Sequence, residues 1–159
     1  VEKYDGDKTE ILKYSKRIYS EKELSEFRTM QQHPNLFPII YKINEKFVVL
    51  EKLNNESAKN NYKALFEIIG EKHRMFTFNA YLIEYLNANG NISAMPEDFI
   101  KVYQDILNNK IKMSNKLKQF FYDIQELLLK IERLNKFQVD ISMFNFGYDK
   151  KGNLKMLDV

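Results

Sequence analysis

The feature that most constrains the fold is a long amphipathic segment near the end of the chain. Residues 113–135 include KLKQFFYDIQELLLKIERL, in which apolar side chains recur every three or four residues. This spacing places them on one stripe of a single helix. Other elements have to cover so wide a stripe, so the sequence predicts a core around this helix. The stripe consists of Leu117, Phe120, Phe121, Ile124, Leu127, Leu128 and Ile131.

The segment before this helix also has a helical period. Gly90 is a helix-stop signal and Pro96 suits the first position of a helix. The pattern predicts three further helices, at 57–69, 76–88 and 96–108.

The first 53 residues have a different pattern. Asp5-Gly6-Asp7 is a turn signal between two short strands, the second at 10–14. Ser20 with Glu23 three residues later is a capping box, so a helix is expected over 20–32, ending before Pro34. Two more strands are expected, at 39–41 and 47–50, around a turn at Asn44-Glu45. The predicted order is therefore β-β-α-β-β.

The tail, QVDISMFNFGYDKKGNLKMLDV, returns to strand. FNFGY and NLKML flank a turn and predict a hairpin. Asp140, Asn145 and Asp158 stand five and thirteen residues apart in this mostly apolar setting, and the hairpin folds the last two toward one site. Such oxygen ligands suit Mg²⁺, which takes one or two of its ligands from the protein and the rest from waters and phosphates. The tail therefore raises the hypothesis of phosphoryl transfer, whose main requirements are positioning and charge stabilisation.

Composition narrows the class of protein. The chain has 159 residues, which suits one domain or a small two-lobed one, and a net charge of +3, which gives no strong nucleic-acid signal. The basic run at 108–118 lacks interleaved aromatic residues and is expected to be a solvated face. There is no cysteine and no apolar run of about 20 residues, so we expect no membrane span and a cytoplasmic location.

The tail resembles the catalytic loop and metal-binding strand of the protein-kinase-like superfamily, H-R-D-x-x-x-x-N followed by a hairpin and D-F-G. Gln138-Val139-Asp140 stands at the H-R-D place, Asn145 at the N, and Leu157-Asp158-Val159 at the start of D-F-G, with both spacings matching. The resemblance implies ATP and Mg²⁺ as ligands. It also implies that Asp140 orients the substrate hydroxyl and that Asn145 and Asp158 hold Mg²⁺.

The upstream half resembles the same superfamily in order. Ile11-Leu12-Lys13 is similar to the V-A-I-K strand, which makes Lys13 the phosphate-binding lysine. EFRTMQQHPN resembles the following helix and favours Glu26 over Glu23 as the partner of Lys13, although both stay open. FVVLEKL resembles the strand that enters the hinge. The resemblance then places Leu50 at the gatekeeper position and the backbone of Glu51 to Leu53 against the adenine.

The fold class that follows is α+β and protein-kinase-like. The resemblance implies a small antiparallel β lobe with one helix over residues 1–53. A mainly helical part over 54–159 would follow, with a helical insertion at 57–112 and the catalytic hairpin at 136–159. The chain begins near the strand that should follow the family's Gly-rich loop and stops where the activation segment begins. We therefore expect it to be part of a longer protein.

Several positions depart from the family pattern. Gln138 replaces the His, and Ser142 stands where Ser/Thr kinases have a lysine, so one cation on the γ-phosphate is missing. Gly147 falls where an apolar residue usually floors the adenine pocket, and Phe146 is the candidate substitute. This short, divergent form looks most like a phage- or bacterium-encoded kinase-like protein, which would act in the host cytoplasm if phage-encoded.

Three functional hypotheses remain open. The first is ATP-dependent phosphoryl transfer to a protein Ser or Thr. The second is an inactive pseudokinase that serves as a protein-binding module, which the missing Gly-rich loop and Ser142 favour. The third is a small-molecule phosphotransferase of the antibiotic-kinase type, in which the insertion at 57–112 would form the substrate pocket. The first two imply a protein substrate or partner.

Overall fold

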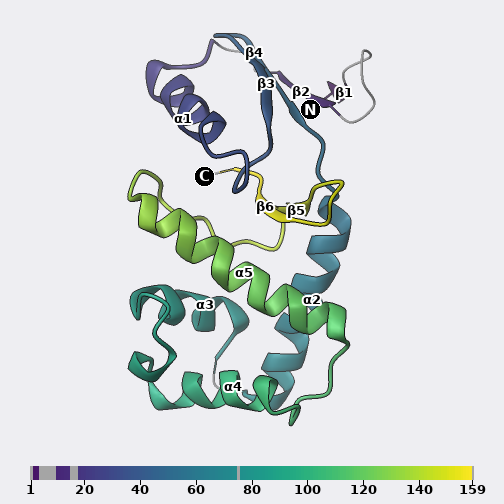
Figure 1. The fold of residues 1–159 in the computed structure, drawn as a ribbon, viewed down its shortest axis with the longest axis vertical. Coiled ribbons are helices and arrows are strands. Elements are labelled where there is room, and N and C mark those ends of the chain that lie inside the picture. The colour runs from purple at the N-terminus through teal and green to yellow at the C-terminus, as the bar shows by residue number, and fades with distance from the viewer. Residues whose placement is uncertain (1, 4–9, 15–17, 75, 159) are drawn as a thin grey trace.

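The computed structural model describes residues 2–3, 10–14, 18–74 and 76–158, with residues 2–3 and 10–14 described by their backbone alone. Within these ranges the chain is α+β. Five α-helices and one short 3-10 turn (Ile92–Ala94) accompany a four-stranded and a two-stranded antiparallel sheet (Figure 1). The expected α+β class is confirmed at this level.

The four-stranded sheet is built from the first third of the chain. Its order is β1-β2-β4-β3, and every neighbouring pair is antiparallel. The predicted order of two strands, a helix and two strands is observed, whereas the predicted Asp5-Gly6-Asp7 turn lies outside the described residues. The elements are β1 (Glu2–Lys3), β2 (Glu10–Tyr14), α1 (Glu21–Gln31), β3 (Ile40–Ile43) and β4 (Phe47–Glu51).

Local hydrogen bonds explain where these elements begin and turn. The Glu23 N–H donates to the Ser20 hydroxyl at 3.1 Å, and the Ser20 N–H donates to the Glu23 carboxylate at 3.2 Å, which confirms the predicted capping box of α1. The Asn44 side chain accepts from the N–H groups of Lys46 and Phe47 at 2.8 and 2.9 Å. It thereby fixes the turn between β3 and β4.

Four helices follow, each close to its predicted position. Side chains of Asn54, Thr77 and Ser114 cap the first, second and fourth of these helices. The first helix begins at residue 55, which is two residues earlier than predicted. Pro96 is the N-cap and not the first helical residue. Gly90 has a φ of +76° and its N–H donates to the Tyr85 carbonyl at 3.0 Å, which ends the second helix. The helices are α2 (Asn55–Lys72), α3 (Phe78–Asn87), α4 (Glu97–Leu107) and α5 (Asn115–Leu134).

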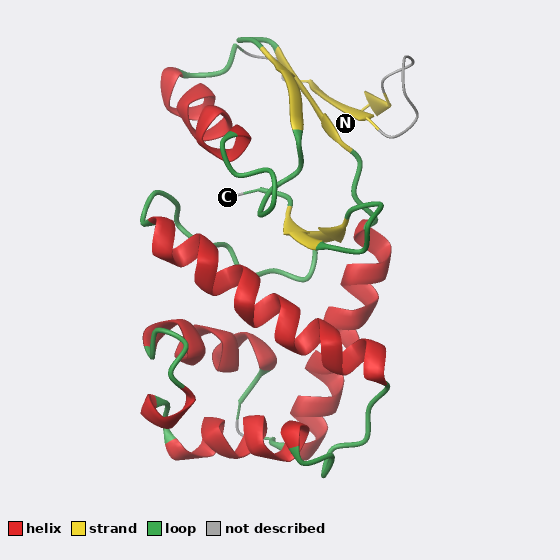
Figure 2. Cartoon of the chain, in the orientation of Figure 1, coloured by secondary structure: helices red, strands yellow, loops and turns green. Residues whose placement is uncertain are grey.

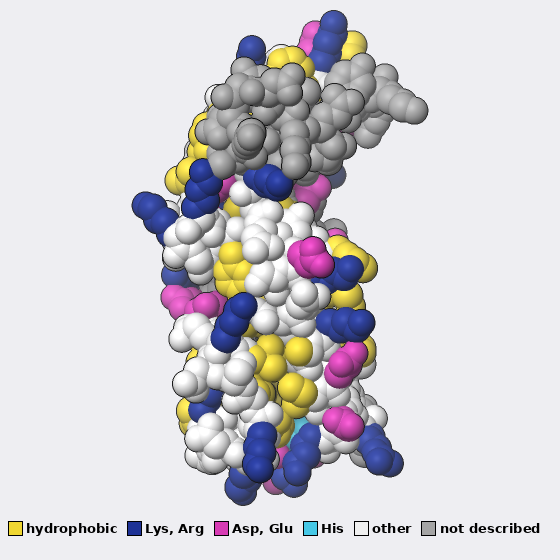
Figure 3. All heavy atoms as spheres, turned by 90° about the vertical axis from the view of Figure 1, so that its right-hand side faces the viewer, with side chains coloured by type: hydrophobic (Ala, Val, Ile, Leu, Met, Phe, Trp, Pro, Cys, Tyr) yellow, Lys and Arg dark blue, Asp and Glu magenta, His cyan; other side chains and the backbone are white. Residues whose placement is uncertain are grey.

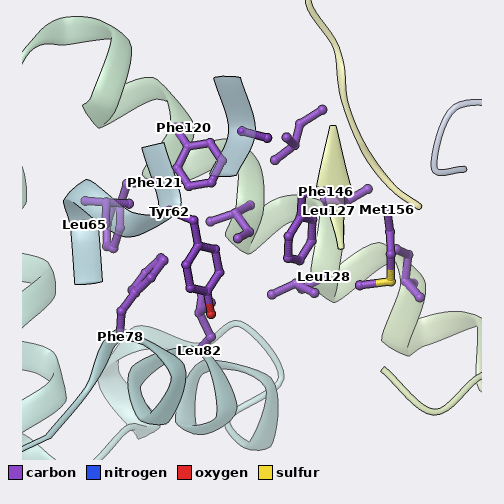
Figure 4. Close-up of a cluster of buried hydrophobic side chains, with 14 of the residues drawn as sticks. Tyr62, Leu65, Phe78, Leu82, Phe120, Phe121, Leu127, Leu128, Phe146 and Met156 are labelled. Atoms are coloured by element: carbon purple, nitrogen blue, oxygen red, sulfur yellow. The ribbon is translucent and has the colours of Figure 1, made fainter. Parts of the chain in front are cut away.

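The core surrounds α5, as its apolar stripe predicted. All seven stripe residues are buried, and they pack against aromatic and aliphatic side chains of α2, α3 and the two-stranded sheet (Figure 4). The Tyr62 ring of α2 stacks on the Phe146 ring, with centroids 6.1 Å apart and planes 17° apart. Burying such rings stabilises this helical part, at about 25 cal/mol per Å² of apolar surface removed from water.

The two-stranded sheet joins the four-stranded sheet to the helices. It consists of β5 (Phe146–Tyr148) and β6 (Leu154–Met156), and it lies between the sheet and α5 (Figures 1 and 2). Asn54 and Tyr148 exchange backbone hydrogen bonds of 2.8 and 3.1 Å, and the Met156 N–H donates to the Leu36 carbonyl at 2.9 Å. The predicted hairpin is confirmed, and it is anchored to the segment just before β3 and to the segment just after β4.

The surface carries both signs of charge. Figure 3 shows Lys and Arg side chains interspersed with Asp and Glu over one face, with basic side chains gathered at its lower end. Lys110, Lys112 and Lys116 of the predicted basic run are exposed, as a solvated face requires. Among the described residues, no helix is both long enough and apolar enough to cross a bilayer.

Candidate active site

The side chain of Asn145 holds the centre of the candidate site together. It is 8% exposed, and its Nδ2 donates to the backbone carbonyls of Asp140 at 3.1 Å and Asp158 at 2.7 Å. Its Oδ1 accepts from the Asp158 N–H at 3.0 Å. A single amide therefore connects the loop after α5 to the residues that follow β6. Asn145 and Asp158 are thirteen positions apart in the sequence.

Backbone contacts fix the same arrangement. The Leu157 N–H donates to the Asn145 carbonyl at 2.9 Å, which extends the pairing of the hairpin beyond β5 and β6. Asn135 has a φ of +53° at the end of α5 and turns the chain from the helix into the loop. The structure thus brings Asp140, Asn145 and Asp158 together, and the residues of the two carboxylates are exposed while Asn145 is buried.

The loop rests on side chains of α2 and α3. The Tyr62 hydroxyl donates to the Asn79 side-chain oxygen, and Asn79 Nδ2 donates to the Ile141 carbonyl at 3.4 Å. Burial, followed by the nearby charge of Asp140, raises the pKa of Tyr62 well above its ordinary value. The hydroxyl therefore stays protonated and keeps donating. No sequence pattern marks Tyr62 or Asn79 as supports of this loop.

A cavity of about 520 Å³ separates α1 from the loop that carries Asp140. Glu26 and Lys22 line it from α1, and residues 136–140 line it from the other side. Glu23, by contrast, is engaged in the capping box. Glu26 is thus the acidic residue of α1 that lines a cavity together with Asp140.

The predicted lysine cannot be placed in the same way. Lys13 pairs with Val48 in the β2–β4 ladder, but its side chain lies outside the described residues. Its pairing with Glu26 or Glu23 stays a prediction. Tyr19, just before α1, has a raised pKa, caused first by burial and then by the charges of Glu23 and Asp158.

The end of β4 is packed onto the hairpin. Leu50 and Leu53 are buried at 4% and 3% exposure, and Leu53 lies against Gly147. A Cβ at Gly147 would stand 2.6 Å from the Leu53 Cβ and 2.8 Å from the Asn55 side-chain oxygen, so only glycine fits there. Phe146 is fully buried against Tyr62 in the helical core. Its predicted contact with adenine, like those of Leu50 and Leu53, stays a prediction.

Glu51 has a side-chain role that the sequence analysis missed. Its carboxylate accepts from Lys155 Nζ at 2.8 Å and from the Ile39 N–H at 3.1 Å. Lys155 is 3% exposed, and its Nζ also lies 3.5 Å from Asp149 Oδ2. Lys155 therefore joins β4 to the hairpin through a buried ion cluster. The sequence pattern did not indicate this burial, because the alternation of Lys155 with Leu154 and Met156 favours an outward-facing lysine.

Asp149 in the hairpin turn completes this cluster. Partial burial acts to raise its pKa, but hydrogen bonds from Asn153, the Lys155 ammonium and the Lys151 N–H outweigh burial and lower the pKa below its ordinary value. The N–H groups of Lys151 and Asn153 donate to Oδ1 at 2.9 and 2.8 Å. The folded state thus favours the charged form of Asp149.

The resemblance assigns Asn145 and Asp158 to Mg²⁺, an ion that takes one or two of its ligands from the protein and the rest from waters and phosphates. In this structure Asn145 Oδ1 already accepts one hydrogen bond, from the Asp158 N–H at 3.0 Å. In the described part of the chain, no group of three His, Cys, Asp or Glu residues is arranged to hold a metal ion by itself. Any metal at this site would therefore depend on further ligands from a bound phosphate or water.

Comparison with known proteins assigns no family. No family model matches the chain, and no solved structure matches it. Among curated proteins, the chain is similar to a protein described as probable polyketide synthase 41 of Dictyostelium discoideum. The two are 29% identical over 141 residues, which cover 73% of this chain and 6% of that protein. The chain thus spans a small fraction of the curated relative that it matches.

Replacing Asn145 by Ala should destabilise the fold. The change leaves the Asp158 N–H and two carbonyls without their partner, at roughly 1–3 kcal/mol for each buried unsatisfied group, partly offset by water. We expect a loss of about 2 kcal/mol in urea unfolding without added ligand. Asn115→Ala, at an exposed position of α5, is the control and should change stability by less than about 0.5 kcal/mol. Equal stabilities of the two variants would contradict the bridging role.

Replacing Asp149 by Asn should change how stability depends on pH. A carboxyl with a lowered folded-state pKa stabilises the fold above its unfolded pKa of about 3.9 and loses that contribution as the pH falls through the folded pKa. Asp149→Asn should therefore be less stable than the wild type at pH 7, and the difference should shrink below about pH 4. Urea unfolding at pH 7, 5, 4 and 3 measures this, with exposed Asp98→Asn as the control. A difference that is as large at pH 3 as at pH 7 would refute it.

Proposed function

We propose that the chain is the catalytic part of a protein-kinase-like, ATP-dependent phosphotransferase that acts on a hydroxyl, most simply that of a protein Ser or Thr. The observation that carries the proposal is the Asn145 amide, which joins Asp140 to Asp158 through hydrogen bonds of 3.1, 2.7 and 3.0 Å. This amide supports the proposal because it connects, through the backbone, the three residues of the tail to which the resemblance gives catalytic and metal-binding roles.

The order of the elements supports the same proposal. A four-stranded sheet with one helix between its second and third strands precedes the helices, and the loop of Asp140 follows the long helix α5. The hairpin of β5 and β6 then leads to Asp158. This is the order that the resemblance implies, with α2, α3 and α4 in the expected helical insertion.

Each residue has a role in the proposed reaction. Asp140 orients the acceptor hydroxyl and takes its proton as the oxygen bonds to the γ-phosphorus, while the bond to the β-phosphate oxygen breaks and ADP leaves. Asn145 and Asp158 would hold Mg²⁺, which neutralises phosphate charge. Lys13 would bind the phosphates, held by Glu26, and the backbone of residues 51–53 would meet the adenine.

One observation favours the pseudokinase alternative. Asn145 Oδ1 already accepts the Asp158 N–H, so the amide is engaged within the protein at both ends. An Asn that serves only to hold the hairpin would leave Asp158 as the single metal ligand of the pair. In this alternative the chain keeps the fold and binds a protein partner without turnover.

A second observation favours a small-molecule phosphotransferase. A cavity of about 250 Å³ lies between α3 of the insertion and the loop, lined by residues that include Ile83, Leu86 and Val139. Val139 also lines the larger cavity beside Asp140. A small acceptor held by the insertion would therefore lie close to the proposed base.

Mg²⁺ with ATP should stabilise the wild-type fold. A ligand at 100 times its Kd adds about 2.7 kcal/mol when it binds only the folded state. We expect an upward shift in Tm with Mg-ATP at millimolar concentration, and a loss of most of that shift in Asp158→Asn. Asp98→Asn, an exposed carboxylate on α4, should keep the shift. No shift for the wild type would exclude nucleotide binding and the phosphotransferase with it.

Phosphate transfer separates the active enzyme from the pseudokinase. With γ-labelled ATP and a generic protein substrate, the wild type should label the substrate. Asp140→Ala should lower the rate by a factor of about 10² or more, because general-base catalysis contributes 10²–10⁴. Asp98→Asn, at an exposed carboxylate on α4, is the control and should label the substrate at the wild-type rate. Labelling by Asp140→Ala at the wild-type rate would remove Asp140 from the base role, and binding of Mg-ATP without labelling of protein or small hydroxyl substrates would favour the pseudokinase.

A further inference from the structure

The cavity beside Asp140 contains two lysines that the proposed reaction does not use. Lys22 lines it from the first turn of α1, and Lys136 lines it from the loop after α5. Phe137 and Val139 contribute apolar lining, and Gln138 adds an amide. Two lysines from separate elements thus line the same cavity as the proposed base.

Neither lysine has a carboxylate as an ion-pair partner among the residues that the structure describes, although Glu26 and Asp140 line the same cavity. Both lysines are exposed. In the proposed reaction Glu26 is held by Lys13, which leaves two lysines and one carboxylate, that of Asp140, as the charged groups of the lining.

A hydroxyl acceptor alone gives no reason for two lysines at this place. Two ammonium groups match the charge of a phosphate dianion, and lysine binds phosphate as a point charge with three donors. The Gln138 amide can donate a further hydrogen bond. A phosphate held between α1 and the loop would stand beside a hydroxyl held at Asp140, since all these residues line one cavity of about 520 Å³.

We propose that Lys22 and Lys136 bind a phosphate group that the acceptor substrate already carries next to the hydroxyl to be phosphorylated. This inference rests on the proposed function and names its substrate class: a phosphorylated hydroxyl compound or residue. The two lysines position the acceptor and take no part in the bond changes.

The test uses inorganic phosphate as the probe, titrated into the whole chain at low ionic strength and followed by NMR or calorimetry. The variant Lys22→Gln/Lys136→Gln removes both charges, and Lys22→Arg/Lys136→Arg keeps them. Lys112→Gln/Lys116→Gln is the control, because it removes the same charge from two exposed lysines of the basic run at 108–118. Far-UV circular dichroism checks that all three fold.

We expect the first variant to weaken phosphate binding at least tenfold, and the other two to stay within about threefold of the wild type. The phosphate affinity of the wild type should persist when Mg²⁺ and a non-hydrolysable ATP analogue saturate the nucleotide site. Binding that the Lys22→Gln/Lys136→Gln variant retains would overturn the inference. Binding that the analogue abolishes would also overturn it, since the phosphate would then occupy the nucleotide's own phosphate site.

The failure of the proposed function has a different signature. Phosphate binding that depends on the two lysines, in a chain that binds neither Mg-ATP nor the analogue, would refute the phosphotransferase and the acceptor role while the anion site stands. Binding of the analogue together with lysine-independent phosphate binding would refute the anion site and leave the proposed function intact.

Discussion

The arrangement of the candidate site depends on one buried amide. Asn145 offers a donor group and an acceptor, and both are used between Asp140 and Asp158. Because a buried amide without partners would cost about 1–3 kcal/mol, the loop and the end of the hairpin are held in the register that satisfies it. The carboxylates need no contact with each other, since the backbone beside each is fixed by the same side chain. Charge is thereby gathered at the surface while a neutral group occupies the interior.

The support beneath this amide comes from the helical part. Phe146, next to Asn145, stacks on Tyr62 of α2, and the Tyr62 hydroxyl reaches the loop through Asn79 of α3. The expected insertion thus contributes directly to the position of the loop. A change in the packing of α3 would alter the hydrogen bond that Asn79 donates to the Ile141 carbonyl, one residue from Asp140. This coupling gives α2 and α3 a structural reason to lie where they do.

A second connection joins the upper sheet to the hairpin. Lys155 is buried between Glu51 at the end of β4 and Asp149 in the hairpin turn, and Gly147 lets Leu53 approach β5 closely. A buried ion pair contributes little net stability, because desolvation offsets most of the attraction, but removing one partner is costly. The cluster therefore serves to fix the position of the sheet relative to the hairpin. In the proposed function this is the segment that would meet the adenine, so its rigidity bears on nucleotide binding.

Local patterns in the sequence were sufficient for the elements. The capping box at Ser20, the Asn44 turn, the stripe of α5 and the hairpin were all predicted, because each depends on residues a few positions apart. The spacing of Asp140, Asn145 and Asp158 also indicated one site. Only the tertiary structure decided that Asn145 bridges the other two through their backbones, that Tyr62 and Asn79 support the loop, and that Lys155 is buried against Glu51. These contacts join residues up to 104 positions apart, and a side chain's partner at such a separation is set by how the elements pack, which no local pattern encodes.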